Sequence, residues 1–429
     1  MAVTGRAPLA ALLGTVLMLV LRTWAGLILI NGLLVLAIAT DLTLAAGVRQ
    51  LRFSRSGDSR IRLGEAGTVY LNIDNPGRRR LRAVVRDSWP PSLGASGRAS
   101  VTVPPRGHGV VMTSFVPERR GDKSAVKVTV RSAGPLGLAA RQASRQVPWT
   151  IRVLPAFLSR KHLPAALAVL RQLDGQRRSL VRGQGTEFDS LREYVIGDDV
   201  RSIDWRSTAR RAEVVVRTWR PERDRRVIIA LDTGRTSAGR VAGVPRLDTY
   251  LDAALLLAAV ATRASDRVDL VAVDRQVRAS VVGASRTELL ARLTDAMAGI
   301  EPALADSDAS LMVSMLLGIS RQRCLVVLMT DLSSPALELT LLPRIPALAA
   351  RHRLMVAAVA DPRVSQLAAG RDDAGSVYQA AAAERAHADR IKVAMLLRRQ
   401  GVDVLDASPD QLPPTVADAY LRLKAAGQL

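Results

Sequence analysis

Residues 227–236 read VIIALDTGRT, a short apolar run that ends on an acid. The β-branched side chains at its start favour a strand that is buried on both faces, and Asp232 falls just past the end of that strand. A second apolar run, Cys324–Met329, is followed in the same way by Thr330 and Asp331. In open parallel sheets, ligands bind outside the carboxyl ends of the strands. If the two strands are neighbours, Asp232 and Asp331 converge on one crevice.

The chain around these two runs alternates between strand and helix patterns. We expect strands at Val227–Leu231, Val268–Val273, Val277–Val282, Cys324–Met329, Leu354–Val359 and Val402–Leu405. Helices are expected at Leu247–Ser265, Thr287–Ala298, Ala309–Ile319, Pro335–Ala350, Ser376–Arg399 and Pro414–Ala426. This alternation predicts a doubly wound, Rossmann-type α/β domain over residues 226–429. The strand Val277–Val282 follows its predecessor too closely for a helical crossover, so it is expected to be an antiparallel edge strand.

The composition limits the classes of partner. The chain of 429 residues carries a net charge of +22, and aromatic residues make up only 3 % of it. Binding of single-stranded nucleic acid uses aromatic side chains as stacking platforms, so an anionic membrane surface is the easier partner for this charge. The single cysteine, Cys324, lies inside an expected buried strand, which excludes a disulfide scaffold and favours a reducing compartment.

Two charge-free stretches near the start, Leu9–Leu21 and Ala25–Thr40, predict membrane-spanning helices. Joined as one helix they would be roughly 48 Å long, well beyond the ~30 Å hydrocarbon core. A hairpin that turns at Arg22 and Trp24 is therefore expected over residues 1–46, because the Arg can snorkel and the indole can sit at the interface. The alternative for the first stretch is a cleaved signal peptide.

Arginines follow the second stretch closely, at positions 49, 52, 55, 60 and 62, whereas Arg22 alone lies in the expected turn. By the positive-inside rule, both ends of the hairpin and the rest of the chain face the cytoplasm. Residues 47–154 then alternate between apolar and polar side chains in short runs, for example Val69, Leu71 and Ile73, which predicts a small β-sandwich. Residues 155–225 are expected to form a connector that carries the motif described next.

Residues 185–217 read GTEFDSLREYVIGDDVRSIDWRSTARRAEVVVR. This run resembles the signature of the bacterial domain of unknown function 58 family, followed by a von Willebrand factor A-like domain. The ending, with Leu412-Pro413-Pro414 and Ala419-Tyr420-Leu421, is similar too, so the resemblance covers essentially the whole chain. It implies a protein anchored in the bacterial inner membrane, without an established catalytic activity, that acts as an adaptor or assembly factor beside a MoxR-type AAA+ ATPase.

The resemblance also implies a metal-ion-dependent adhesion site, written Asp-x-Ser-x-Ser and completed by a later Thr and Asp. Asp232 and Thr236 match the first and third ligands, Gly234 replaces the middle Ser, and Asp331 matches the late Asp. Hard oxygen ligands of this kind suit Mg²⁺, which could then accept a carboxylate of a partner. Arg235 adds repulsive charge beside such an ion. The alternative is that the two acids accept backbone N–H bonds at their loops.

The Thr-bearing loop of that site has no clean counterpart, although four polar residues lie near the right place: Asp306, Ser307, Asp308 and Ser310.

The signature run combines acids, arginines and a tryptophan that we interpret as a partner surface. Its marked residues are Glu187, Arg192, Tyr194, Asp198, Asp199, Arg201, Asp204, Trp205 and Arg210. We expect Asp198, Asp199 and Asp204 to pair with arginines among Arg192, Arg201, Arg206 and Arg210 in bidentate fashion, around Trp205 as a buried anchor. The same arginines could instead meet the phosphates of nucleic acid or lipid.

The sequence lacks motifs that several enzyme classes require. The chain has no Gly-x-x-x-x-Gly-Lys-Ser/Thr phosphate loop, and its four histidines, at positions 108, 162, 352 and 387, stand at no zinc-ligand spacing from a Cys or His. The leading hypothesis is a membrane-anchored adaptor, and the resemblance implies that its partner is an AAA+ ATPase. The alternatives are a metal-dependent hydrolase that uses Asp204, Asp232 and Asp331, and a membrane-tethered nucleic-acid binder whose affinity falls steeply with salt.

Overall fold

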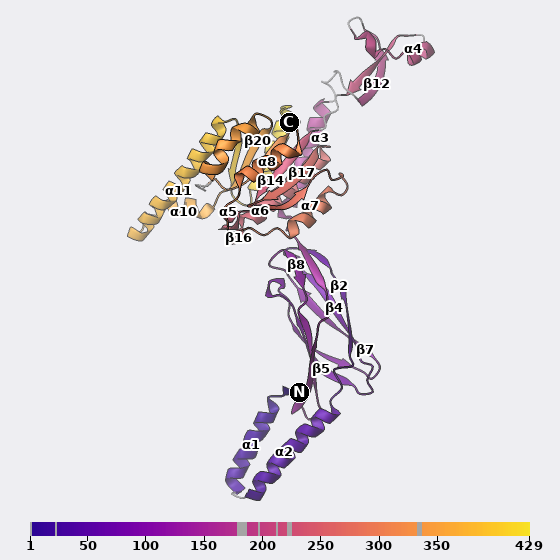
Figure 1. The fold of residues 1–429 in the computed structure, drawn as a ribbon, viewed down its shortest axis with the longest axis vertical. Helices are drawn as coiled ribbons and strands as arrows, with labels where there is room; N and C mark the ends of the chain where they lie inside the picture. Colours follow the sequence, from indigo (N-terminus) through magenta and orange to yellow (C-terminus); the bar gives the residue numbers. More distant parts are fainter. Residues whose placement is uncertain are drawn as a thin grey trace. The chain divides into compact units, whose positions relative to one another are not determined.

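The computed structural model describes residues 2–21, 24–177, 187–195, 198–211, 213–220, 225–332 and 337–429. It divides into two compact units, the first ending at Ala156 and the second beginning at Phe157 (Figure 1). Each unit is described by itself below.

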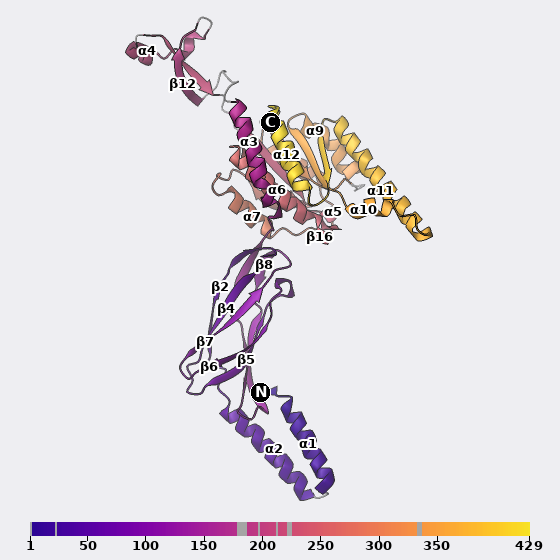
Figure 2. The same cartoon turned by 180° about the vertical axis from the view of Figure 1, so that it is seen from behind.

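The first unit opens with two apolar helices, α1 (Arg6–Leu21) and α2 (Trp24–Leu44), which lie side by side in Figures 1 and 2. Gly14 permits this contact, because a Cβ atom there would lie 2.8 Å from the Cγ2 of Ile30. Among the described residues, α2 is the helix that is long and apolar enough to cross a bilayer, with a mean hydropathy of 2.2. A membrane anchor and a leader sequence both have this length and composition.

Both ends of the helix pair are attached to the β-structure that follows. Before α1, the two-residue strand β1 (Ala2–Val3) pairs antiparallel with β10. Near the end of α2, the buried carboxylate of Asp41 accepts the backbone N–H groups of Leu136 at 2.7 Å, Leu138 at 2.6 Å and Ala139 at 2.9 Å. The chain just before α1 and the end of α2 are therefore both attached to the same part of the sandwich, around the start of β10.

The β-structure of the first unit is a sandwich of short strands. Its strands are β2 (Arg52–Gly57), β3 (Arg60–Arg62), β4 (Gly67–Asp74), β5 (Leu81–Ser88), β6 (Arg98–Val103), β7 (His108–Phe115), β8 (Gly121–Ser124), β9 (Lys127–Ala133), β10 (Ala139–Arg145) and β11 (Thr150–Leu154), with a 3₁₀ turn at Pro91–Leu93. They form sheets in the orders β1-β10-β9-β5-β6, β2-β4-β7 and β3-β11-β8. Alternate side chains of β4 and β5, such as Leu71 and Val85, point into the core.

One buried ion pair lies within this sandwich. The side chains of Arg55 and Asp87 are 0 % and 2 % exposed, and they make two hydrogen bonds of 2.6 and 3.2 Å. Asp87 also accepts the indole N–H of Trp89 at 2.9 Å, and the guanidinium lies 4.7 Å from the centroid of that ring. The carboxylate is thus satisfied from several sides, as a buried charge requires.

The second unit is built around a six-stranded sheet in the order β18-β17-β14-β19-β20-β21. These strands are β14 (Arg226–Asp232), β17 (Arg267–Val273), β18 (Val277–Val281), β19 (Leu325–Met329), β20 (Arg353–Val359) and β21 (Asp403–Ala407). All adjacent pairs are parallel except β17 with β18, so the prediction of an antiparallel edge strand is confirmed. The predicted α/β sheet is confirmed with it.

Helices cover both faces of this sheet (Figure 2). One face packs against α3 (Leu163–Arg177), α6 (Arg246–Arg263), α7 (Leu289–Ala298) and α12 (Leu412–Ala425). The other packs against α8 (Ala309–Ile319), α9 (Ile345–Ala349) and the C-terminal part of α11 (Ala374–Arg399). Within β14, Ile229 and Leu231 face the α6 side while Ile228 and Ala230 face the α8 side, so neighbouring residues reach opposite layers.

Apart from residues 187–220, which are described with the site, the remaining elements of this unit are short. They are the 3₁₀ turn Leu158–His162, α5 (Arg235–Ala238), the strands β15 (Arg240–Val241) and β16 (Val244–Pro245), and α10 (Pro362–Ala368). The helix expected at Pro335–Ala350 is replaced by a π-helical turn at Leu337–Leu341, a 3₁₀ turn at Leu342–Arg344 and α9, while residues 333–336 lie outside the described part. Pro343 and Pro346 explain this, because each lacks a backbone N–H for a regular helical ladder.

We expect Asp87→Asn to lower the free energy of unfolding of the sandwich by about 3–5 kcal/mol, because it leaves the buried Arg55 charge without a counter-charge. The matched control is Asp122→Asn. Its pair with Arg152 is exposed (37 % and 54 % for the Arg and the Asp), so the cost should stay below about 1 kcal/mol. Pulse proteolysis of the full-length protein across a urea series measures both. Equal shifts for the two variants would contradict the assignment.

Candidate functional site

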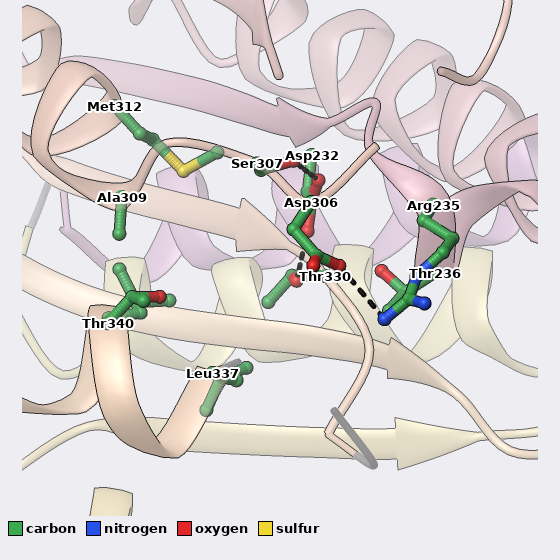
Figure 3. Close-up of a pocket in the computed structure, with 11 residues that line it drawn as sticks. Asp232, Arg235, Thr236, Asp306, Ser307, Ala309, Met312, Thr330, Leu337 and Thr340 are labelled. Carbon is green, nitrogen blue, oxygen red and sulfur yellow. Dashed lines mark hydrogen bonds and ion pairs between the residues drawn. The ribbon is translucent and has the colours of Figure 1, made fainter. Parts of the chain in front are cut away.

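A small cavity lies at the carboxyl edge of β14 and β19, with a volume of about 40 Å³ (Figure 3). Its polar side is formed by Asp232, Arg235, Thr236, Asp306, Ser307 and Thr330, and its apolar side by Ala309, Met312, Leu337, Leu341 and the stem of Thr340. Polar and apolar residues thus face each other across a space that admits an ion with water or the tip of one side chain.

Asp232 is the centre of the polar side. Its carboxylate accepts the hydroxyl of Thr330 at 2.6 Å, the backbone N–H of Gly234 at 2.9 Å, and a hydrogen bond from the hydroxyl of Ser307. The strand register explains the first contact. Leu231 pairs with Met329 in the parallel ladder, so the next residues, Asp232 and Thr330, lie level and point to the same side. Ser307 supplies the hydroxyl for which the sequence shows no clean motif.

Gly234 has a steric role in this arrangement. A Cβ atom at this position would collide with the hydroxyl of Ser307 and lie 3.0 Å from the carbonyl oxygen of Ala305. That same carbonyl accepts the backbone N–H of Arg235 at 2.9 Å. The glycine that replaces the middle Ser of the adhesion-site pattern therefore lets the loop at residues 305–307 close onto Asp232.

Asp331 does not join this cavity, which corrects the expected convergence of the two acids. Its carboxylate is 4 % exposed and is held by Arg390 at 2.6 Å and by Arg246 at 3.0 Å. Asp331 lies one residue past the position level with Asp232, beyond the end of β19, where Arg246 at the start of α6 and Arg390 of α11 both reach it. A carboxylate bonded to two guanidinium groups is not free to ligate a metal ion.

Arg390 ties the edge of the sheet together. Besides Asp331 it binds Asp406 at 2.6 Å and the carbonyl oxygen of Val359 at 3.2 Å. Burial alone would lower the pKa of Arg390, but its interactions with Asp406 and Asp331 outweigh burial and raise that pKa, so the guanidinium stays charged. This cluster therefore stabilises the fold next to the cavity.

The residues around Asp232 match a divalent cation in donor type. The Asp232 carboxylate and the hydroxyl groups of Thr236, Ser307 and Thr330 are hard oxygen donors, which Mg²⁺ prefers. The charge of Arg235 is partly balanced, because its guanidinium lies 3.1 Å from the carboxylate of Asp306 in an exposed pair. Among the described residues, no group of three or more His, Cys, Asp or Glu side chains could hold a metal ion. Any ion here would depend on a single buried carboxylate and on hydroxyls.

The signature run forms a small module of its own, which we call the signature hairpin (residues 187–220). The antiparallel strands β12 (Glu187–Glu193) and β13 (Val215–Arg220) enclose a 3₁₀ turn (Val200–Ser202) and α4 (Trp205–Arg211). Arg192 binds Asp198 at 2.5 Å, so this pair of the expected lattice is present. The side chain of Glu187 lies outside the described part, and the backbone N–H of Tyr194 donates to Val214.

The other expected pairs of the signature hairpin are different in the structure. Asp204 binds Arg217 at 2.7 Å and caps α4 by accepting the N–H of Ser207 at 2.9 Å; these contacts lower the pKa of Asp204. Asp199 caps the 3₁₀ turn through the backbone N–H of Arg201. Arg201, Arg206 and Arg210 are exposed at the surface. The local capping preference of Asp decided these partners.

Trp205 is 69 % exposed, so the prediction of a buried anchor is wrong. It is the first residue of α4, where its side chain projects from the hairpin. Val195 and Val200 are each 61 % exposed in the same hairpin. The signature hairpin therefore presents apolar side chains and arginines together.

Cys324 and His352 meet inside the domain, which the sequence spacing did not predict. The thiol sulfur lies 3.2 Å from Nδ1 of the ring, and the two residues are 2 % and 1 % exposed. Burial raises the pKa of Cys324 to about 11 and lowers the pKa of His352. Both groups are thus neutral, at the amino end of β19 and away from the cavity, as expected of core residues.

The fold defines a mixed α/β domain preceded by the signature hairpin. Residues 190–392 match the family described as "Protein of unknown function DUF58". Uncharacterized proteins of Mycobacterium bovis and of two strains of Mycobacterium tuberculosis are each 26 % identical over 208 residues, which is 47 % of this chain and 64 % of those relatives. The chain thus spans less than two thirds of their length.

Two solved structures cover 24 % of this chain each. They are the CARDB domain of a Pyrococcus furiosus protein in complex with di-metal ions (12 % identity, 92 % of that chain, TM-score 0.19) and a FixG-related protein from Vibrio parahaemolyticus (10 % identity, 95 % of that chain, TM-score 0.18).

We expect Cys324 to resist alkylation by iodoacetamide in the native protein at pH 8, because only about 0.1 % of a thiol with a pKa near 11 is ionised there. Since burial raises this pKa, the thiolate fraction grows only as the pH rises toward that value. Mass spectrometry should detect full labelling after unfolding in urea at pH 8. Rapid labelling of the native protein at pH 7 would identify a reactive cysteine instead.

Proposed function

We propose that this chain is a membrane-anchored, cytoplasm-facing adaptor with a von Willebrand factor A-like domain, and that its partner is an AAA+ ATPase of the MoxR type. The observation that carries the proposal is the cavity at Asp232. It holds about 40 Å³, far below the roughly 300–1,000 Å³ of small-molecule sites, so a side chain of a docked protein suits it better than a free substrate.

The strand order supports the von Willebrand factor A-like assignment. In chain order the strands of the sheet lie as third, second, first, fourth, fifth and sixth. In such a sheet the order reverses between the first and fourth strands, which here are β14 and β19, and ligands bind at that point. Asp232 lies there, and its loop carries the pattern that resembles an adhesion site.

Recognition in the cavity would depend on its single buried carboxylate. Asp232, Thr236, Ser307 and Thr330 would hold Mg²⁺, which when bound supplies an open coordination position for an acidic side chain of the partner. Neighbouring side chains of the protein hold the ligands of this site in place. The hydroxyls of Ser307 and Thr330 donate to Asp232 and so direct their oxygen lone pairs toward the cavity, while Met312 and Leu337 form an apolar wall for the stem of a bound side chain.

Membrane anchoring is supported by the way α2 joins the sandwich. Asp41, near the end of α2, satisfies three backbone N–H groups of residues 136–139 from a buried position. Removing α2 as a leader would leave these donors without their acceptor, which is costly in a folded domain. This contact therefore supports an α2 that stays part of the protein and remains in the bilayer.

A second contact with the partner is proposed at the signature hairpin. Exposed tryptophan and arginine side chains are the residue types that dominate binding energy at protein interfaces, and aromatic residues are scarce in this chain. Trp205 stands beside Arg206 on α4, with Arg201 just before it. This combination suits a protein surface that carries both apolar and acidic groups.

We expect Asp232→Asn to reduce capture of the MoxR-type ATPase by full-length protein in detergent at least about tenfold in Mg²⁺ buffer, because one charge at the docking point is lost. Asp418→Asn removes an exposed charge on α12 and serves as the matched control, with no expected change. The captured ATPase is quantified by mass spectrometry, with and without EDTA. If the wild type recovers no such ATPase, the proposed partner is wrong. If both variants recover equal amounts, the cavity at Asp232 is not the docking point.

We expect Trp205→Ala to weaken binding of the same ATPase about thirtyfold or more, as for an interface residue that supplies roughly 2 kcal/mol. Tyr378→Ala is the control, because this aromatic side chain is 79 % exposed on α11 in the same unit. Binding of the purified ATPase is measured by titration. If the two substitutions have the same effect, the signature hairpin is not the contact surface.

A further inference from the structure

A second, larger cavity lies where α2 meets the sandwich, within the first unit. Its volume is about 770 Å³. Three segments line it: the end of α2 with the residues after it, the turn between β4 and β5, and the start of β10. It is separate in sequence and in unit from the cavity at Asp232.

The walls of this junction cavity are held together by hydrogen bonds. Arg141 donates to the carbonyl oxygen of Leu42 at 2.8 Å, and Arg79 donates to the carbonyl oxygen of Thr43. These carbonyls belong to the last turn of α2, where helix carbonyls lack partners within the helix. Together with Asp41, the two arginines fix the end of the helix to the sandwich.

The turn between β4 and β5 is also held in place by hydrogen bonds. Asn75 is 3 % exposed, and its amide donates to the carbonyl oxygens of Arg79 at 2.8 Å and Pro104 at 3.1 Å, while its side-chain oxygen accepts the N–H of Gly77 at 3.1 Å. This ordered turn brings Arg78 and Arg79 to the cavity.

The charge of the lining has one sign. Arg49, Arg78, Arg79 and Arg141 contribute to it, and none of the described residues that line the cavity is an Asp or Glu. The side chains of Arg49 and Arg78 are exposed. Four guanidinium groups without a carboxylate repel each other and favour an anion, which arginine binds in bidentate fashion when it is a phosphate.

Part of the lining of the junction cavity is apolar. Leu42, Ala45, Ala46 and Val48 line it beside the arginines. The cavity begins where α2 ends, and 21 residues of helix rise about 31 Å, close to the ~30 Å hydrocarbon core. With α2 across the membrane, the cavity is at the level of the lipid headgroups, where anionic lipids attract basic residues.

We propose that the junction cavity binds the headgroup phosphate of an anionic phospholipid, with Arg49 and Arg78 as the residues that contact it. The inference rests on the proposed membrane anchoring. The apolar part of the lining receives the glycerol end of the lipid, and Arg79 and Arg141 keep the cavity open through their bonds to α2. The bound lipid attaches the sandwich to the leaflet from which α2 emerges.

The test is native mass spectrometry of the full-length protein in a non-ionic detergent, titrated with phosphatidylglycerol or with phosphatidylcholine. We expect tighter binding of phosphatidylglycerol by about tenfold or more. The double variant Arg49→Gln/Arg78→Gln should lose about thirtyfold of that affinity, since each basic residue near a lipid surface contributes to attraction. Arg49→Lys/Arg78→Lys keeps the charge without the bidentate fork and should recover part of it.

The matched control is Arg86→Gln/Arg98→Gln, which removes two exposed arginines that face each other on β5 and β6 of the same sandwich. We expect a change of less than about twofold there. Equal losses in both double variants, or equal binding of the two lipids, would overturn the site. Tighter binding of inorganic phosphate or of a single-stranded oligonucleotide than of phosphatidylglycerol would overturn the lipid as its ligand. Carbonate extraction separates the two proposals: if the wild type is released from membranes, the anchoring itself fails.

Discussion

The parallel pairing of β14 with β19 is the constraint on which the candidate site depends. Because Leu231 and Met329 are partners in the ladder, the residues that follow them are level, and the hydroxyl of Thr330 meets the carboxylate of Asp232. Asp331 lies one residue further along, past the end of β19, and is neutralised by Arg246 of α6 and Arg390 of α11. Asp232 therefore lines the cavity, whereas Asp331 forms ion pairs that stabilise the fold.

Close approach completes the polar side of that cavity. A glycine at position 234 lets the loop at residues 305–307 reach Asp232, so that a hydroxyl from one loop replaces the one that a serine at 234 would bring. Next to it, the cluster around Arg390 joins α11 to the ends of three strands. A buried charge is costly unless its hydrogen-bonding groups have partners. Here the guanidinium of Arg390 donates to the carboxylates of Asp331 and Asp406 and to the carbonyl oxygen of Val359.

The same rule governs the start of the chain. Asp41 is 0 % exposed at the end of an apolar helix, and this polar side chain is tolerated there because three backbone N–H groups converge on it. Arg79 and Arg141 cap the last carbonyls of that helix. The helix and the sandwich are consequently one unit, and four arginines line the cavity where they join.

The sequence alone determined the apolar helix near the start, the short strands after it and the six-stranded α/β sheet with its antiparallel edge, because these follow from local periodicity and connection length. It also located Asp232, because an acid at a strand end is a local signal. Tertiary structure alone decided the contacts of Asp331, the exposure of Trp205, the meeting of Cys324 with His352 and the placing of Ser307 on Asp232. Each of these depends on register and on loops that approach from distant parts of the chain, and such pairings leave no periodic trace in the residues themselves.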